Sequence, residues 1–173
     1  IILSPTSVLL KDSDPFDYAK LERVISTSKK AQFEFSIVPQ QDQFGLLEIE
    51  FLDAKGNPGI RVFLDSTGSV NVKAGYRNKS VGKYRASETL NLALELDVKT
   101  RFYKMNINGK QIGNNLFFAP IQEVERVVLR TGSTRRFPDA DTPTDQDYDL
   151  AKPGEKTKEA AYLIKSFKAT KIQ

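Results

Sequence analysis

The strongest pattern in this chain is the alternation of apolar and polar positions, and it is clearest over residues 90–110. Four leucines occupy every second position from residue 90 to residue 96, and a second extended run covers residues 102–107 and ends at Asn108-Gly109. A period of two is that of a β-strand with one buried face, and Asn-Gly is typical of tight turns. This stretch therefore predicts a β-hairpin followed by a turn, around which the other strands are arranged.

The same alternation recurs on both sides of the hairpin. It predicts strands at residues 33–37, 44–52, 60–64, 70–76, 124–129 and 159–172, and shorter ones at residues 8–10 and 22–26. Turn-forming Asp, Gly and Asn residues separate the central strands, which arrive roughly every 12 residues. We interpret residues 77–87 as basic and irregular, and residues 114–120 as a buried crossing segment.

These elements predict an all-β fold: an antiparallel two-sheet β-sandwich of the jelly-roll type with roughly eleven or twelve strands. We expect a single domain, 1–173, in which the C-terminal strand lies beside the N-terminal one. Residues 133–158 are rich in Asp and Pro and poor in aliphatic residues, which predicts a long loop that is functional or held by polar contacts. Because the chain opens on Ile1 rather than Met, we expect either a mature form or, as the favoured interpretation, a domain excised from a larger protein.

The absence of Cys and His excludes several kinds of chemistry. Without these residues the chain has no disulfide, no thiolate or imidazole zinc site, no Cys nucleophile and no catalytic triad with a His base. The net charge of +4 is modest, and no apolar run approaches the ~20 residues that a membrane-spanning helix needs. We therefore expect neither a membrane span nor a nucleic-acid partner.

Three groups of residues, taken in order, resemble a known family. They are FEFSIVP at residues 33–39, then GLLEIEFLDAKG at 45–56 with IRVFLDSTGSV at 60–70, then LELDVKTRFYKMNINGK at 94–110. Together they resemble the concanavalin A-like lectin/glucanase superfamily in its laminin-G-like branch. The resemblance implies a non-catalytic carbohydrate-binding or structural accessory domain of an extracytoplasmic bacterial protein that processes polysaccharides. Its partner would be a polysaccharide or a neighbouring catalytic domain.

Glu48 and Glu50 invite comparison with the carboxylates of the superfamily's retaining glucanases. Residues two apart on a strand share a face, and those enzymes hold two carboxylates about 5 Å apart. Here the order of Glu and Asp differs, and Asp53 begins a strong turn. We therefore favour an interpretation in which Glu48 and Glu50 only solvate the outer face of the sheet. The alternative is a glycoside hydrolase or polysaccharide lyase of concanavalin A-like fold that uses them.

The candidate ligand-binding residues lie in the basic stretch at residues 73–85. They are Lys73, Tyr76, Arg77 and Tyr84. Arg forks suit the carboxylates of acidic polysaccharides, and Tyr rings offer an apolar face to a sugar in a chain without Trp. The stretch could also contact another partner such as nucleic acid, or be a solvated edge where lysines discourage sheet association, and we favour the solvated edge.

The candidate metal ligands lie in the loop at residues 133–158. Calcium binds several oxygen atoms at once, and closely spaced Asp residues in a loop can supply them. Turn and capping roles, with pairing to Arg135 and Arg136, are the favoured interpretation, and Ca²⁺ is the candidate cofactor. The residues in question are Asp139, Asp141, Asp145, Asp147 and, more loosely, Asp149.

Overall fold

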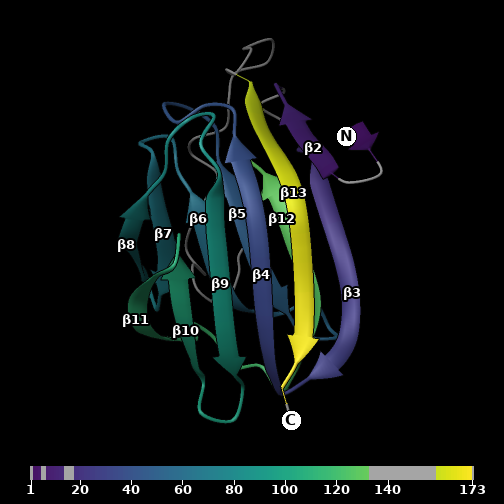
Figure 1. Ribbon diagram of the computed structural model, residues 1–173. Coiled ribbons are helices and arrows are strands. Elements are labelled where there is room, and N and C mark those ends of the chain that lie inside the picture. Colours follow the sequence, from purple (N-terminus) through teal and green to yellow (C-terminus); the bar gives the residue numbers. More distant parts are fainter. Residues whose placement is uncertain (1, 5–6, 14–17, 133–158, 173) are drawn as a thin grey trace.

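A computed structural model describes residues 2–4, 7–13, 18–132 and 159–172 of the protein. Over these ranges the chain forms thirteen β-strands and no helix. The strands make two antiparallel sheets that stack face to face (Figure 1). The predicted all-β, two-sheet sandwich of jelly-roll type is therefore confirmed.

Seven strands form the sheet nearer the viewer in Figure 1, in the order β1-β2-β13-β4-β9-β10-β11. Their bounds are β1 Ile2–Ser4, β2 Ser7–Asp12, β13 Ala160–Lys171, β4 Lys30–Pro39, β9 Leu90–Asp97, β10 Phe102–Ile107 and β11 Lys110–Leu116. The other sheet has the order β3-β12-β5-β6-β7-β8. Its bounds are β3 Lys20–Ser28, β12 Val124–Thr131, β5 Leu47–Leu52, β6 Pro58–Leu64, β7 Ser69–Ala74 and β8 Arg77–Lys83.

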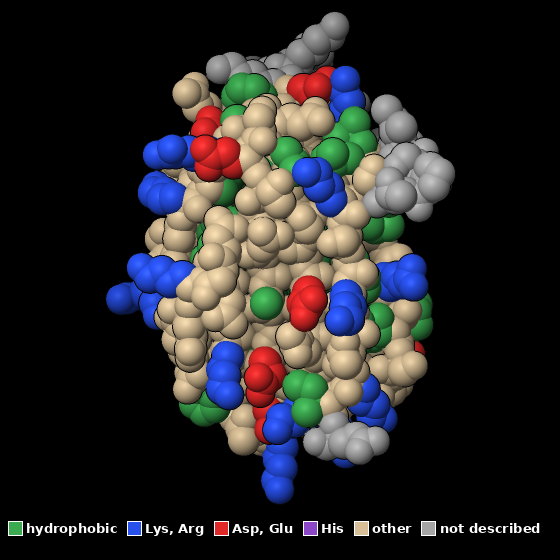
Figure 2. Space-filling view, in the orientation of Figure 1, with side chains coloured by type: hydrophobic (Ala, Val, Ile, Leu, Met, Phe, Trp, Pro, Cys, Tyr) green, Lys and Arg blue, Asp and Glu red, His purple; other side chains and the backbone are tan. Residues whose placement is uncertain are grey.

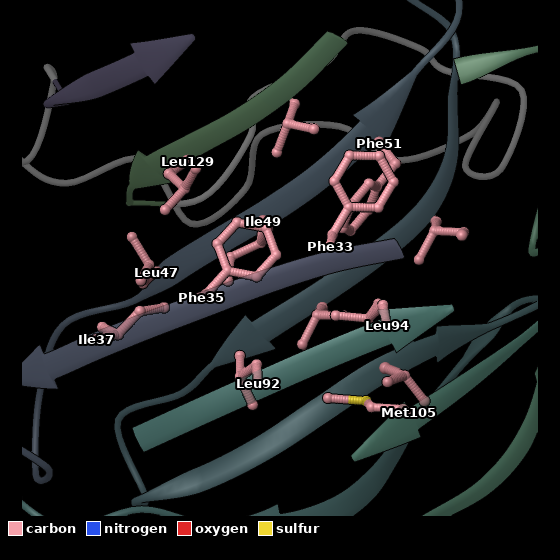
Figure 3. Packing of buried hydrophobic residues seen from close by; sticks show 14 of the residues in the cluster. Phe33, Phe35, Ile37, Leu47, Ile49, Phe51, Leu92, Leu94, Met105 and Leu129 are labelled. Atoms are coloured by element: carbon pink, nitrogen blue, oxygen red, sulfur yellow. The ribbon is translucent and has the colours of Figure 1, made fainter. Parts of the chain in front are cut away.

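The core lies between the two sheets and follows the alternation seen in the sequence. Every second side chain of β4 and of β9 is buried. Phe33 of β4 meets Phe51 of β5 across the sandwich with ring centroids 4.8 Å apart (Figure 3). Each large apolar side chain buried in this way stabilises the fold by roughly 1.5–3 kcal/mol. The core therefore fixes which faces of the two sheets remain for binding.

The predicted hairpin is present as β9 and β10. Leu94 pairs with Met105 and Leu96 with Tyr103. The Asn-Gly turn then leads into β11, and both Asn108 and Gly109 have positive φ, as a tight turn of the I′ type requires. The C-terminal strand β13 pairs with the N-terminal strand β2, as predicted.

Two predictions about irregular segments were wrong, and both segments lie at sheet edges. Residues 77–83 form the regular strand β8, which pairs only with β7. Residues 114–116 belong to β11, in which Asn114 and Leu116 are exposed and Asn115 is the one buried residue. An edge strand is held by the ladder on one side and buries few side chains, so it lacks the apolar alternation from which the other strands were predicted.

Candidate functional site

The outer face of the six-stranded sheet carries two ion pairs. The register places Arg130 of β12 opposite Glu48 and Arg61 of β6 opposite Glu50. Arg130 Nη2 donates to Glu48 Oε2 at 2.8 Å, and Arg61 Nε donates to Glu50 Oε1 at 2.9 Å. Glu48 and Glu50 are only 8% and 2% exposed. The expectation that they solvate this face is therefore wrong, because cross-strand guanidinium groups neutralise them and allow their burial.

Aromatic rings lie over both guanidinium groups. The Arg61 guanidinium carbon is 5.3 Å from the centre of the Phe118 ring, and that of Arg130 is 5.3 Å from the centre of the Tyr18 ring. These are cation–π distances. Since the charged groups already have partners and little exposure, a sugar has poor access to them.

A pocket opens at the end of the sandwich where β4, β6 and β8 finish, and we call it the end pocket. It has a volume of about 370 Å³ and is open to solvent. Three separate segments form it: the β4–β5 loop, the β6–β7 turn and the chain just after β8. Its lining residues are Asp42, Gln43, Thr67, Gly68, Lys83, Tyr84 and Arg85.

The β6–β7 turn is held by Asp65. Its Oδ1 atom accepts hydrogen bonds from Thr67 N at 2.8 Å, Thr67 Oγ1 at 2.6 Å and Ser69 N at 3.1 Å. Its Oδ2 atom accepts one from Asn71 Nδ2 at 2.6 Å. Burial acts to raise the pKa of Asp65, but the hydrogen bonds outweigh it and leave that pKa below its ordinary value. The turn therefore presents Thr67 and Gly68 to the pocket in a fixed geometry.

Gly68 is the point where the three segments meet. Its φ is +71°, and a Cβ atom there would lie 3.3 Å from Tyr84 O and 3.4 Å from Asp42 O. Tyr84 N donates to Gly68 O at 2.9 Å, and the Tyr84 hydroxyl donates to Asp65 O at 2.6 Å. Burial raises the pKa of Tyr84 to about 12. Tyr84 thus serves as a wall of the end pocket and offers no exposed ring for stacking.

The end pocket combines acceptors and cationic donors around one opening. Asp42 Oδ2 accepts a hydrogen bond from Ala86 N at 3.2 Å, and Lys83 Nζ donates to Ser69 Oγ at 2.8 Å. Gln43 and Arg85 are exposed at the rim. A sugar hydroxyl both donates and accepts hydrogen bonds, so a concave site with carboxylate, amide and ammonium groups suits it.

The four predicted ligand residues do not meet at one place. Lys73 is near the end of β7, Tyr76 lies in the β7–β8 turn with 84% exposure, and Arg77 begins β8. Tyr84 comes directly after the last residue of β8. Because β8 has seven residues with a rise of about 3.3 Å each, Tyr84 lies roughly 20 Å from Arg77. Their assignment to a ligand stays a prediction. The sequence analysis missed Asp42, Gln43 and Gly68 as pocket residues because only the tertiary fold brings their segments together.

The predicted calcium ligands Asp139, Asp141, Asp145 and Asp147 lie outside the described residues. Within residues 2–4, 7–13, 18–132 and 159–172, no three Asp or Glu side chains are grouped so as to hold a metal ion. The same ranges contain no helix long and apolar enough to cross a membrane.

Comparison with known proteins identifies the family. The model of the sialidase-like CBM domain, where CBM denotes a carbohydrate-binding module, matches residues 3–146. The chain belongs to the sialidase-like CBM family. This membership confirms the expectation of a carbohydrate-binding accessory domain. No curated protein sequence matches the chain.

Solved structures agree with this family. A solved sialidase structure is 37% identical to this sialidase-like CBM chain, with a TM-score of 0.86. The match covers 98% of this chain but only 16% of that sialidase. Sheep galectin-11 in complex with glycerol is 12% identical, with 87% of this chain and 96% of the galectin covered and a TM-score of 0.55. The alginate lyase AlgAT5 of polysaccharide lyase family 7 is 9% identical, with 95% and 78% covered and a TM-score of 0.59. The last two show the fold alone, which is concanavalin A-like.

Proposed function

We propose that this chain is the non-catalytic carbohydrate-binding domain of a larger glycan-processing protein and that it binds sugar in the end pocket. The end pocket carries the proposal, because it joins hydrogen-bonding side chains of both charges in an open concave site. Membership of the sialidase-like CBM family supports the ligand class. The solved sialidase supports a sialidase as the larger protein and sialylated glycans as the target, since this chain spans only a small part of it.

An extracytoplasmic location, a bacterial origin, a neighbouring catalytic domain and the laminin-G-like branch belong to the same proposal. A module that delivers an enzyme to polysaccharides or cell-surface glycans works where these glycans are found. The single domain 1–173 is then one unit of the larger chain, and its binding site is independent of the enzyme's active site.

A glycosidase or lyase that uses Glu48 and Glu50 is the second candidate. A glycosidase needs one carboxyl group that can give a proton and another that can reach the sugar. Both side chains are instead hydrogen-bonded to guanidinium groups and are almost fully buried. Activity screening on a polysaccharide panel with Glu48→Gln and Glu50→Gln separates the two candidates, because an activity that survives both changes excludes these residues as catalysts.

Titration with oligosaccharides tests the end pocket. Sialylated and neutral oligosaccharides are added to the ¹⁵N-labelled chain, and we expect amide shifts concentrated at Thr67, Gly68 and Arg85. The double change Asp42→Ala and Gln43→Ala should weaken binding about tenfold, as expected for the loss of one or two hydrogen bonds. The matched control alters one carboxylate and one amide in the loop before β12, by Glu123→Ala and Gln122→Ala, and should bind as the wild type does. Shifts that map elsewhere, or equal losses in both variants, contradict the end-pocket site.

A further inference from the structure

One hairpin carries basic residues without any acidic residue among them. Residues 66–87 contain five basic residues and no Asp or Glu. Removing these five from the 26 basic residues of the chain leaves 21, against 22 acidic residues. This stretch, the β7–β8 hairpin with the residues next to it, thus has a net charge of +5, and the rest of the chain has a net charge of −1. These basic residues are Lys73, Arg77, Lys79, Lys83 and Arg85.

Most of these cations have no carboxylate partner among the described residues. Within the part of the chain that the structure describes, Lys73, Arg77, Lys79 and Lys83 form no ion pair, whereas Arg85 lies 3.8 Å from Glu88. Among the lysines elsewhere, Lys11, Lys20 and Lys104 each pair with a glutamate, as Lys11 does with Glu159 at 2.9 Å. An unpaired cluster of like charges opposes folding through self-repulsion, so its position calls for a functional explanation.

The geometry of the hairpin favours an extended anionic partner. β8 is an edge strand of the six-stranded sheet, and its first four residues are exposed. Arg77 and Lys79 are two apart on the strand, so they project to the same side about 6.6 Å from each other. Figure 2 shows several Lys and Arg side chains on the left flank, where Figure 1 places β7 and β8, and others spread over the rest of this face. Tyr76 stands exposed at the turn, next to Arg77.

We infer that this basic edge, which consists of Lys73, Tyr76, Arg77, Lys79 and Lys83, is a second binding surface and that it takes a polyanionic polysaccharide. The polymer lies along β8, with its carboxylate or sulfate groups on the cations and a sugar face against Tyr76. The choice of a glycan over other polyanions rests on the proposed carbohydrate-binding function. The edge runs toward the end pocket, because Lys83 belongs to both.

This mode of binding has a distinct salt dependence. Each cation that neutralises a polymer charge releases a counterion, and on a densely charged polyanion the affinity falls by up to about 0.9 log units per log unit of salt for each contact. Four contacts predict a loss of affinity on the order of 100-fold between 50 and 200 mM salt. Binding of a single sugar in the end pocket should change far less.

Affinity electrophoresis and salt titration with polygalacturonate test the inference, with dextran as the uncharged polymer. The variant Arg77→Gln/Lys79→Gln should lower the slope of log affinity against log salt by about two and reduce affinity at 50 mM salt at least tenfold. Lys168→Gln/Lys171→Gln on β13 removes the same charge from exposed positions outside the basic edge and should bind as the wild type does. Equal losses in the two variants, or equal retention on dextran, overturn the inference.

Two further arms identify the partner class and separate this surface from the end pocket. Double-stranded DNA and vesicles containing phosphatidylserine are titrated at matched salt, and binding to either that equals binding to polygalacturonate overturns the assignment to a glycan. The Asp42→Ala/Gln43→Ala variant should retain polygalacturonate as the wild type does. Retention in that variant together with loss in Arg77→Gln/Lys79→Gln supports the basic edge even if no oligosaccharide enters the end pocket. Loss of polymer binding in both variants contradicts a separate surface.

Discussion

Glu50→Gln provides the sharpest test of the charged outer face. The substitution keeps the shape of the side chain but removes its charge, and it leaves the Arg61 guanidinium only 12% exposed opposite a neutral amide. Breaking a buried ion pair costs about 3–5 kcal/mol, because one charge stays buried without compensation. The amide oxygen can still accept from Arg61 Nε, and the Phe118 ring still lies 5.3 Å from the guanidinium carbon. We therefore expect the lower value, about 3 kcal/mol.

Thermal and urea unfolding followed by circular dichroism measure this cost. For a domain of this size, about 3 kcal/mol corresponds to a fall in melting temperature of roughly 6–12 °C. Glu95→Gln is the matched control, since Glu95 pairs with Lys104 at 3.6 Å with side chains 42% and 55% exposed. An exposed pair contributes at most about 1 kcal/mol. A Glu50→Gln variant that melts together with Glu95→Gln would refute the reasoning.

A companion substitution separates the ion pair from other roles of Glu50. Replacing both partners by Met, in Glu50→Met/Arg61→Met, leaves no unpaired charge, so the double variant should be more stable than Glu50→Gln. If Glu50 were catalytic instead, Glu50→Gln would abolish an activity with little effect on stability. The stability of the two variants and their activity on polysaccharides therefore distinguish a structural carboxylate from a reactive one.

The remaining predictions concern the end pocket and the calcium hypothesis. Gly68→Ala should cost more stability than Gly56→Ala in urea unfolding: both glycines have positive φ, which costs Ala about 1–2 kcal/mol, but only Gly68 has backbone oxygens within 3.4 Å of the new Cβ. The pKa of Asp65 lies below its ordinary 3.8, so its carboxylate stabilises the fold above pH 3.8 and loses this effect as the pH falls through the folded-state pKa; Asp65→Asn should flatten that acid limb. The pKa of Tyr84 is about 12 against an ordinary 10.0, so the stability from its neutral phenol is complete below pH 10 and lost as the pH rises through 12; Tyr84→Phe should flatten that alkaline limb. Calcium at Asp139, Asp141, Asp145 and Asp147 predicts heat in calorimetry and a higher melting temperature for a chelator-stripped sample, and no response would exclude it.

The alternation of apolar and polar residues predicted the strands that bury one face. It did not predict edge strands, or buried residues whose partners lie far away in the sequence. β4 and β9 alternate along their whole length because one side faces the core. β8 buries few side chains, so its sequence lacks the alternation that predicts a strand. Glu48 reads as a solvent-facing residue because its partner Arg130 is 82 positions away, and only the strand register shows that the two meet. Local sequence carries the period of a strand but not the identity of its neighbour.

The end pocket, too, could be predicted from the sequence only in part. The Asp65 turn was recognisable from its sequence, since Asp, Thr and Gly are typical turn residues. The approach of Asp42 and Tyr84 to Gly68 was not, because these residues come from segments that the sandwich brings together at its end. In the sequence the aromatic ring of Tyr84 indicates a surface for sugar stacking, yet in the fold that ring is buried and forms a wall of the end pocket.

Substitutions of the paired charges and of the unpaired charges should affect different properties of this protein. The ion pairs of Glu48 and Glu50 hold strands together, so altering them affects the fold before it affects a ligand. Arg77 and Lys79 are exposed and form no ion pair within the described ranges, so substituting them should leave stability within about 0.5 kcal/mol of the wild type. Binding specificity can therefore vary at the β8 edge without cost to the sandwich. Unfolding curves of Arg77→Gln/Lys79→Gln that match the wild type, together with a changed salt slope, would place these charges in binding rather than in folding.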